Sequence, residues 1–341
     1  TVVFGYLGAV VGAGFVSGQE VIQFFVINGK QGWWGTLLAA MLFIILAAVL
    51  LRTVHRHKVS NYQGLLTLLF AGRPAAVLDL LLAGFLFLGI SIMLSASGAI
   101  FLEHFSWPRS AGIILTYLTV LLTLLSGKQG LVASYNYLVP IKIILLLAVN
   151  LYLALGITNE EMGYYLTVLQ KPGNYYWAIA AVLYVAYNFT LAMVVLVEYQ
   201  AITTKRQGVG GAVLGGALLG GLLILNFWAL ANNIPQVFAY EIPMLFTAGR
   251  ISLEIKYCYL LILWLGILTT AIANTYGFTQ RLSKYWGTNF KTTLFLALSL
   301  ALPLSWQSFS DLVGWLYPVF GIMGTIIIGA LIYRYGKDIA M

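Results

Sequence analysis

Charged residues are scarce in this chain of 341 residues, since Asp, Glu, Lys and Arg together make up 8% of it. Soluble domains carry about 25%, so this composition excludes an ordinary water-soluble protein. Hydrophobic residues account for 61% of the sequence, and the mean hydropathy is +0.93. Apolar runs of about 18 residues or more recur along the whole length. We therefore expect an all-α, polytopic membrane protein.

Other absences exclude several kinds of chemistry. Cys258 is the only cysteine, which excludes an internal disulfide and a thiolate metal cluster. His55, His57 and His104 stand apart from acidic clusters, so we expect no metal site. The sequence contains no Gly-x-Ser-x-Gly, His-Glu-x-x-His or phosphate-binding loop. We therefore expect neither an enzyme nor a bound cofactor.

About ten apolar segments are long enough to cross a membrane. They are residues 2–25 (broken at 12–15), 35–51, 78–101, 111–125, 131–155, 176–202, 209–231, 257–278, 292–304 and 309–335. The chain starts with Thr1 inside the first segment. We therefore expect further residues before it, and no targeting sequence can be identified.

Lysine and arginine gather at alternate connections between these segments. One side carries Arg52, Arg56, Lys58, Arg73, Lys128, Lys205, Arg206, Arg281, Lys284, Lys291, Arg334 and Lys337. Such an excess marks the cytoplasmic side. We therefore expect both termini in the cytoplasm and the protein in the inner membrane of a bacterium. The net charge of +8 then indicates membrane orientation rather than a nucleic-acid partner.

A polar segment, 156–174, separates five spans from five. An odd number of spans per half gives the halves opposite topology, the inverted repeat of many secondary transporters. We expect the first repeat over 1–156 and the second over 157–341, within one membrane domain. This design predicts a second broken helix near Tyr184–Thr190. The alternative is an ordinary helix in which Asn188 or Thr190 makes an interhelical hydrogen bond.

The first span contains four glycines, at Gly8, Gly12, Gly14 and Gly18. Each glycine weakens a helix by about 1 kcal/mol relative to alanine, and unwound backbone inside a membrane needs protein or a water-filled cavity to satisfy it. Ser17 and Glu20 follow directly, so the segment predicts a discontinuous helix at a binding site. Free N–H groups at residues 12–15 favour a substrate carboxylate. Close helix packing through small residues is the alternative for Gly8 and Gly12.

Lys142 lies deep inside the fifth span. An ammonium at the centre of a bilayer costs about 2.5–3.5 kcal/mol on insertion scales, which favours a functional role over a side chain that reaches the interface. Thr269 and Thr270 in the eighth span are the expected oxygen partners. Paired threonines also commonly bond back to their own helix.

At this point the sequence resembles the amino acid–polyamine–organocation superfamily of transporters, which has the LeuT-type fold. The segment Gly12-Ala-Gly-Phe-Val-Ser-Gly-Gln-Glu20 is similar to the YkvI-like branch, and the resemblance covers essentially the whole chain. It implies ten helices in a five-plus-five inverted repeat, with helices one and six discontinuous. Residues 8–14 match the broken helix one, and Tyr187–Thr190 fall where helix six unwinds.

The resemblance also implies a coupling site. Leu268-Thr269-Thr270-Ala-Ile-Ala273 is similar to the segment that supplies hydroxyls to a sodium site of the family. The matching carbonyls are those of Gly8, Val11 and Gly266. Val139-Pro-Ile-Lys142 resembles sodium-independent relatives, in which a lysine ammonium takes the place of that sodium.

We therefore expect a secondary transporter of a small organic solute, an amino acid or similar zwitterion, that is proton-coupled or an exchanger. The expected substrate site consists of Gly12, Ala13, Gly14, Phe15, Ser17, Glu20, Tyr184, Tyr187, Asn188, Phe189 and Thr190. The expected coupling site consists of Lys142, Gly8, Val11, Gly266, Thr269 and Thr270. One alternative is a sodium symporter that uses the same site without Lys142. The other is a membrane receptor that senses a solute without transporting it. The expected partners are the substrate and the lipid bilayer.

Overall fold

The computed structural model describes residues 2–70, 72–126, 128–156, 162–169 and 175–340, with only the backbone described at 128–136 and 156. The described chain is helical. Its α-helices are α1 (Val2–Val10), α2 (Ala13–Ser17), α3 (Gln19–Phe24), α4 (Lys30–His57), α5 (Tyr62–Leu69), α6 (Arg73–Phe105), α7 (Arg109–Leu124), α8 (Lys128–Gly156), α9 (Met162–Leu169), α10 (Tyr176–Leu196), α11 (Lys205–Ala231), α12 (Pro243–Ile251), α13 (Leu253–Trp286), α14 (Phe290–Ser305) and α15 (Phe309–Ala340). Three short 3₁₀ helices are η1 (Val26–Asn28), η2 (Val197–Ala201) and η3 (Gln236–Ala239).

Seven helices of the described chain are long and apolar enough to span a membrane: α4, α6, α8, α10 with η2, α11, α13 and α15. The apolar helices α7 and α14 are shorter, at 16 residues each, and the first expected span is divided into α1, α2 and α3. The protein is therefore a multi-pass membrane protein, as expected from its composition. The count of ten spans and the inverted repeat stay predictions.

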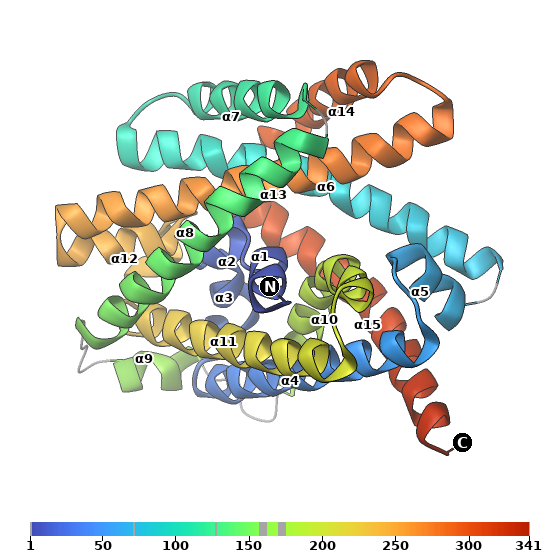
Figure 1. The fold of residues 1–341 in the computed structure, drawn as a ribbon. Helices are drawn as coiled ribbons and strands as arrows, with labels where there is room; N and C mark the ends of the chain where they lie inside the picture. The colour runs from blue at the N-terminus through green and yellow to red at the C-terminus, as the bar shows by residue number, and fades with distance from the viewer. Residues whose placement is uncertain (1, 71, 127, 157–161, 170–174, 341) are drawn as a thin grey trace.

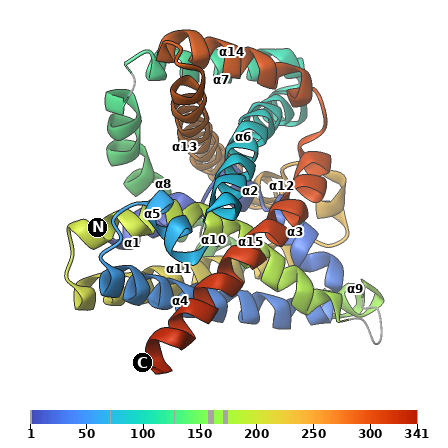
Figure 2. The same cartoon turned by 90° about the vertical axis from the view of Figure 1, so that its right-hand side faces the viewer.

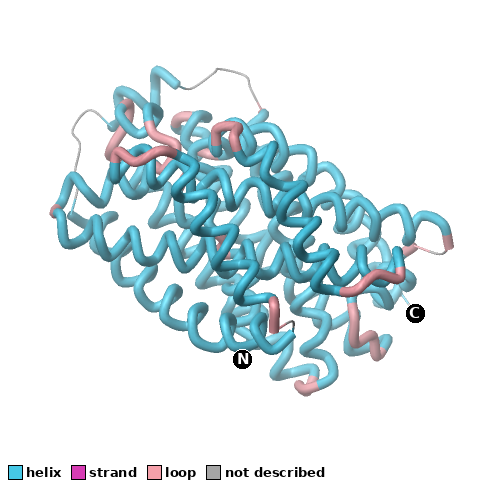
Figure 3. The backbone as a smooth tube through the Cα atoms, turned by 90° about the horizontal axis from the view of Figure 1, so that it is seen from above, coloured by secondary structure: helices cyan, strands magenta, loops and turns pink. Residues whose placement is uncertain are grey.

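The helices form two layers with the broken first span between them. α4 packs along α11 and contacts α10, whereas α6 packs along α13 and contacts α7 and α14. Figures 1 and 2 show these groups on opposite sides of α1, α2 and α3. α8 contacts α1, α11 and α13, so it joins the two layers beside the break. Seen from above in Figure 3, short loops connect most of the helices.

The two ends of the described chain lie at the same end of this bundle. Val2 packs against Gly211 at the start of α11. The same end of α11 places Gly208 against His55 near the end of α4. The next turn of α4 carries His57, whose Nε2 lies 2.7 Å from Oδ2 of Asp338 near the end of α15. This arrangement suits an even number of spans, and the membrane side that this end faces stays a prediction.

The expected break in the sixth span is wrong. α10 is continuous through Tyr184–Thr190 and changes to a 3₁₀ helix only at Val197. Asn188 Nδ2 donates to the Tyr184 carbonyl at 3.1 Å, and Thr190 Oγ1 donates to the Ala186 carbonyl at 2.7 Å. Because these polar side chains bond within their own helix, and no glycine or proline interrupts the segment, the backbone has no cause to unwind.

Two expected connections contain short helices. The polar segment 156–174 contains the short helix α9, and the rest of it, 157–161 and 170–174, lies outside the described residues. The boundary between 1–156 and 157–341 therefore also falls there. The connection between the expected spans 209–231 and 257–278 contains η3 and α12. Pro243 starts α12 because its fixed φ and missing N–H suit the first turn of a helix.

Candidate functional site

The first span is broken at Val11–Gly12, so the break is narrower than the expected 12–15, and residues 13–15 are helical. A second kink follows. α1 ends at Val10, and Gly12 adopts extended backbone angles (φ −90°, ψ −173°) before α2. Gly18 has φ +81°, a left-handed conformation that favours glycine, and separates α2 from α3. The Ser17 hydroxyl donates to the Gly14 carbonyl at 2.9 Å and accepts from the Gln19 N–H at 3.1 Å. Ser17 therefore holds the second kink in place.

Glycines also bring the broken helix close to its neighbours. A Cβ atom on Gly8 would lie 2.9 Å from Val139 Cγ1 of α8. One on Gly12 would lie 2.9 Å from Thr270 Oγ1 of α13, and one on Gly266 would lie 3.6 Å from Ala13 Cα. The two explanations of the glycines, a break and close packing, therefore both apply.

Lys142 lies where α8, α13 and the break meet. Its side chain is fully buried, and its Nζ donates to the Val11 carbonyl at 2.6 Å and to Thr269 Oγ1 at 3.1 Å. Val11 belongs to the break, where carbonyls lose their helical partners. The Thr269 hydroxyl lies 3.1 Å from the Gly266 carbonyl. The structure thus brings together Lys142, Val11, Gly266 and Thr269, and places Thr270 one residue further, against Gly12.

Glu20 lies against the first turn of α2. A Cβ atom on Gly14 would lie 1.9 Å from Glu20 Oε1, so the carboxylate rests on the Gly14 Cα. Tyr187 and Asn188 of α10 lie beside this carboxylate. Glu20 Oε2 and the Tyr184 hydroxyl are buried without a hydrogen-bond partner. These unpartnered polar atoms mark a place where a ligand would supply the missing partners.

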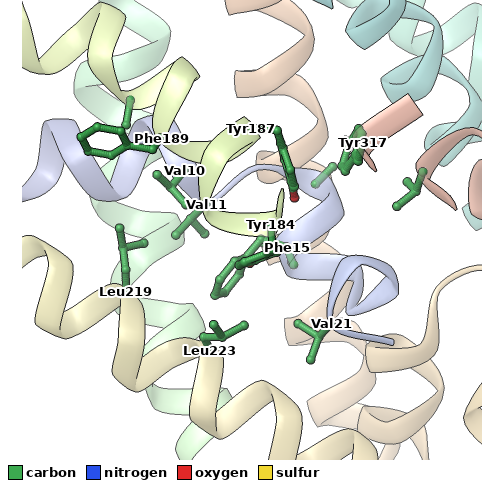
Figure 4. Packing of buried hydrophobic residues seen from close by; sticks show 14 of the residues in the cluster. Val10, Val11, Phe15, Val21, Tyr184, Tyr187, Phe189, Leu219, Leu223 and Tyr317 are labelled. Carbon is green, nitrogen blue, oxygen red and sulfur yellow. The ribbon is translucent and has the colours of Figure 1, made fainter. Parts of the chain in front are cut away.

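Aromatic rings line the space around Glu20. The ring centroid of Tyr187 lies 5.7 Å from that of Tyr184, 4.6 Å from that of Tyr317 on α15 and 5.8 Å from that of Phe24 on α3. Figure 4 shows the Tyr187 hydroxyl pointing toward the broken helix, with Tyr317 beside the ring. Four elements, α3, α10, α15 and the break, thus meet at one buried group.

Two of the expected residues on α10 face elsewhere. Tyr184, Tyr187 and Asn188 share one face, since residues three and four apart on a helix are neighbours. Phe189 points away from Tyr187, toward Val10 and Leu219 (Figure 4). The Thr190 hydroxyl lies 2.8 Å from where a Cβ on Gly324 of α15 would be.

Sequence reasoning missed Phe24 and Tyr317. Phe24 carries a detectable signal, because it lies one helical turn after Glu20 and therefore on the same face of α3. Tyr317 carries no such signal in the sequence, because only the packing of α15 against the other helices brings it to the site.

Buried asparagines and a tyrosine hold the carbonyls of α2. Asn226 Nδ2 of α11 donates to the Phe15 carbonyl at 3.3 Å, while Asn150 Nδ2 of α8 donates to Asn226 Oδ1 at 2.9 Å. The Tyr259 hydroxyl of α13 donates to the Val16 carbonyl at 2.7 Å. The Phe15 carbonyl also accepts from the Gly18 N–H at 3.3 Å. The side-chain contacts add donors to carbonyls at the end of α2, and they fix α2 against three long helices.

A cavity of about 210 Å³ lies next to the site, on the side of α3. Its lining includes Gln19 and Gln23 of α3, Ser310 of α15, and residues 237–241. Gln19 Oε1 is buried without a hydrogen-bond partner, and the residue after it is Glu20. This cavity, which we term the outer cavity, lies toward the end of the bundle opposite the chain termini.

The sequence is similar to two proteins of Bacillus subtilis (strain 168) over nearly its whole length. The uncharacterized membrane protein YkvI is 28% identical over 335 residues, covering 97% of this chain and 94% of YkvI. The uncharacterized protein YyaD is 23% identical over 333 residues, covering 96% of this chain and 94% of YyaD. No family model matches the chain.

The fold is similar to that of Mhp1, a nucleobase-cation-symport-1 family transporter. A closed conformation of Mhp1 with bromovinylhydantoin bound gives a TM-score of 0.58 at 12% identity, covering 92% of this chain and 73% of that one. The inward-facing conformation gives 0.63 at 14%, covering 97% and 76%. At this identity the likeness shows the fold alone. The expected LeuT-type transporter fold is therefore confirmed, and the expected branch of the superfamily stays a prediction.

Proposed function

We propose that this protein is a secondary transporter of a small organic solute, an amino acid or similar zwitterion, that works by alternating access in the inner membrane of a bacterium. The observation that carries the proposal is the broken first span. It lies between two helix layers of a transporter fold and gathers buried polar groups that lack partners. Such discontinuous helices form the substrate and ion sites of many transporters.

Substrate binding is assigned to the break and to the face of α10 that lies over it. The N–H groups of Ala13, Gly14 and Phe15, in the first turn of α2, have no partners within the helix and favour a negatively charged group. The Gly12 N–H donates to the Val10 carbonyl at 2.8 Å instead. Tyr184, Tyr187 and Asn188 surround the remainder of the solute. Ser17 contributes by holding the second kink, and Glu20 by offering a carboxylate to an amine or a proton.

Coupling is assigned to Lys142. Its ammonium uses the Val11 carbonyl and the Thr269 hydroxyl, oxygens that a sodium ion at this site would also need. A second positive charge there would be repelled strongly at low effective dielectric. We therefore infer sodium-independent transport, either as exchange or with Lys142 gaining and losing a proton as the layers move.

Uptake into liposomes tests this assignment. A thermal-stability screen of amino acids on the purified protein first identifies a ligand, since a solute bound only by the folded state raises apparent stability. Uptake of that radiolabelled solute is then measured in sodium and in choline media, with and without a pH gradient. We expect equal uptake in the two media. Uptake that requires a sodium gradient identifies the sodium symporter instead, and binding without uptake identifies the receptor.

Substitutions at Lys142 test whether its ammonium is needed for transport. We expect Lys142→Ala to fold and to lose most of its uptake, because the contacts of the ammonium with the break and with α13 disappear. Lys142→Arg should not restore uptake, since a guanidinium is bulkier and stays charged. Lys284→Ala, at an exposed lysine on the same helix as Thr269, is the matched control. Full uptake by Lys142→Ala contradicts the coupling role.

A further inference from the structure

The Glu20 carboxylate has no counter-charge within the described chain. Its side chain is 4% exposed, and no lysine, arginine or histidine of the described residues forms an ion pair with it. The buried cation of this region, Lys142, is bound to Val11 and Thr269 instead. An ionised carboxylate that is buried without a counter-charge is strongly unfavourable, so such a group either binds a proton or pairs with a cation. Tyr187 and Asn188 lie beside Glu20, but they are neutral, so the described chain leaves the place of a cation open.

The walls around Glu20 suit a positively charged partner. Rings of Phe24, Tyr184, Tyr187 and Tyr317 form a chain of contacts around it, with centroid distances of 4.6 to 5.8 Å between neighbours. Aromatic faces attract cations through their quadrupole. The unpartnered Tyr184 hydroxyl and the Tyr187 hydroxyl beside the carboxylate add oxygens that accept hydrogen bonds.

We propose that the Glu20 cage, defined as Glu20, Phe24, Tyr184, Tyr187 and Tyr317, binds an alkylammonium group of the substrate. The N–H groups of the ammonium donate to Glu20 Oε2 and to the tyrosine hydroxyls, and its carbon chain packs on the rings. The proposal rests on the substrate site assigned above, but it does not depend on transport. It makes the cationic nitrogen, rather than the carboxylate, the group that the protein recognises most strongly.

Binding of n-butylammonium to the full-length protein tests the proposal, with n-butyrate at equal ionic strength as the probe of opposite charge. We expect n-butylammonium to raise the melting temperature of the purified protein in a concentration-dependent way, and n-butyrate at the same concentration to raise it less. Glu20→Gln keeps the shape and removes the charge. It should weaken n-butylammonium binding about tenfold or more, as expected from the loss of a charge-assisted hydrogen bond.

Two further variants serve as controls. Glu20→Asp keeps the charge on a shorter side chain and should retain more n-butylammonium binding than Glu20→Gln. Glu198→Gln makes the same chemical change at an exposed carboxylate and should bind like the unmodified protein. The proposal is overturned if n-butylammonium gives no stabilisation, if Glu20→Gln retains it in full, or if n-butyrate stabilises equally.

These results are separable from the transport assay. Stabilisation by n-butylammonium together with absence of solute uptake supports the cage and overturns the transporter. Uptake of a neutral or anionic solute without any n-butylammonium binding supports the transporter and overturns the cage.

Discussion

At the scale of single residues, Gly14 is the glycine of the candidate site where an added side chain meets the Glu20 carboxylate. Any Cβ there meets Glu20 Oε1, at 1.9 Å for the ideal position, so a side chain displaces the carboxylate from the break. We expect Gly14→Leu to insert and fold but to abolish binding of the solute and of n-butylammonium. Thermal-shift titration of the purified variant measures this.

Gly84→Leu is the matched control for that experiment. Gly84 lies in α6 with no atom within 4 Å of an added Cβ and is exposed. Leucine there should leave binding unchanged. Unaltered affinity in Gly14→Leu would count decisively against the site at the first span.

The roles of single residues differ in how far the sequence predicts them. The role of Lys142 is predictable, because a charge deep in an apolar span needs polar partners. The adjacent threonines Thr269 and Thr270 supply hydroxyls inside another apolar span. The role of Tyr317 is not predictable, since a tyrosine in an apolar helix has the same sequence pattern whether it faces a site, another helix or lipid. Phe189 and Tyr187 are two residues apart, and only the rotation of α10 decides which of them faces Glu20.

At the scale of elements, the first span and α10 show what sequence patterns determine. Glycines in an apolar run have a conformational cost wherever they lie, so the break at Gly12 is predictable. Asn188 and Thr190 are compatible with either an unwound or an intact helix, because their side chains bond equally well to their own backbone. In the structure the helix is intact at these residues, and the 3₁₀ helix η2 begins only at Val197.

The kink between α2 and α3 yields a prediction of its own. Gly18 has φ +81°, and an added Cβ would lie 2.6 Å from Met244 Cγ. We expect Gly18→Ala to destabilise the protein by at least about 1–2 kcal/mol, the cost of a left-handed conformation for an L-residue. Thermal unfolding in detergent measures the change.

Gly221→Ala provides a control of opposite sign. Gly221 lies inside α11, is exposed and has open space around an added Cβ, so alanine should stabilise the helix by about 0.5–1 kcal/mol. If both substitutions raise the melting temperature, the kink at Gly18 is not the native conformation.

At the scale of the whole molecule, ion pairs join the helices at both ends of the bundle. At the end with the outer cavity, Glu241 pairs with Arg109 of α7 and accepts from the Phe309 N–H at the start of α15. Glu103 of α6 accepts from the N–H groups of Glu241 and Ile242. At the end with the chain termini, Asp338 of α15 pairs with His57 of α4 and with Arg334. α15 takes part in both clusters.

Alternating access requires that these two clusters oppose each other. In alternating access only one end of the bundle is open at a time. Removing contacts that close one end shifts the equilibrium toward the state in which that end is open. The equilibrium constant changes about tenfold for each 1.4 kcal/mol of contact free energy removed. Glu241→Gln should therefore open the end with the outer cavity. Asp338→Asn should open the opposite end and thereby close the outer cavity.

Thiol labelling of the outer cavity measures both effects. The chain has a single cysteine, Cys258, so Cys258→Ser gives a background without thiols. Gln23→Cys then places one reporter in the lining of the outer cavity. In lipid nanodiscs, where both membrane sides are accessible, we expect Glu241→Gln to raise the labelling rate of this reporter and Asp338→Asn to lower it. If the labelling rate rises in both variants, each cluster only stabilises the structure of its own end. That result would contradict alternating access, because coupled ends respond in opposite directions.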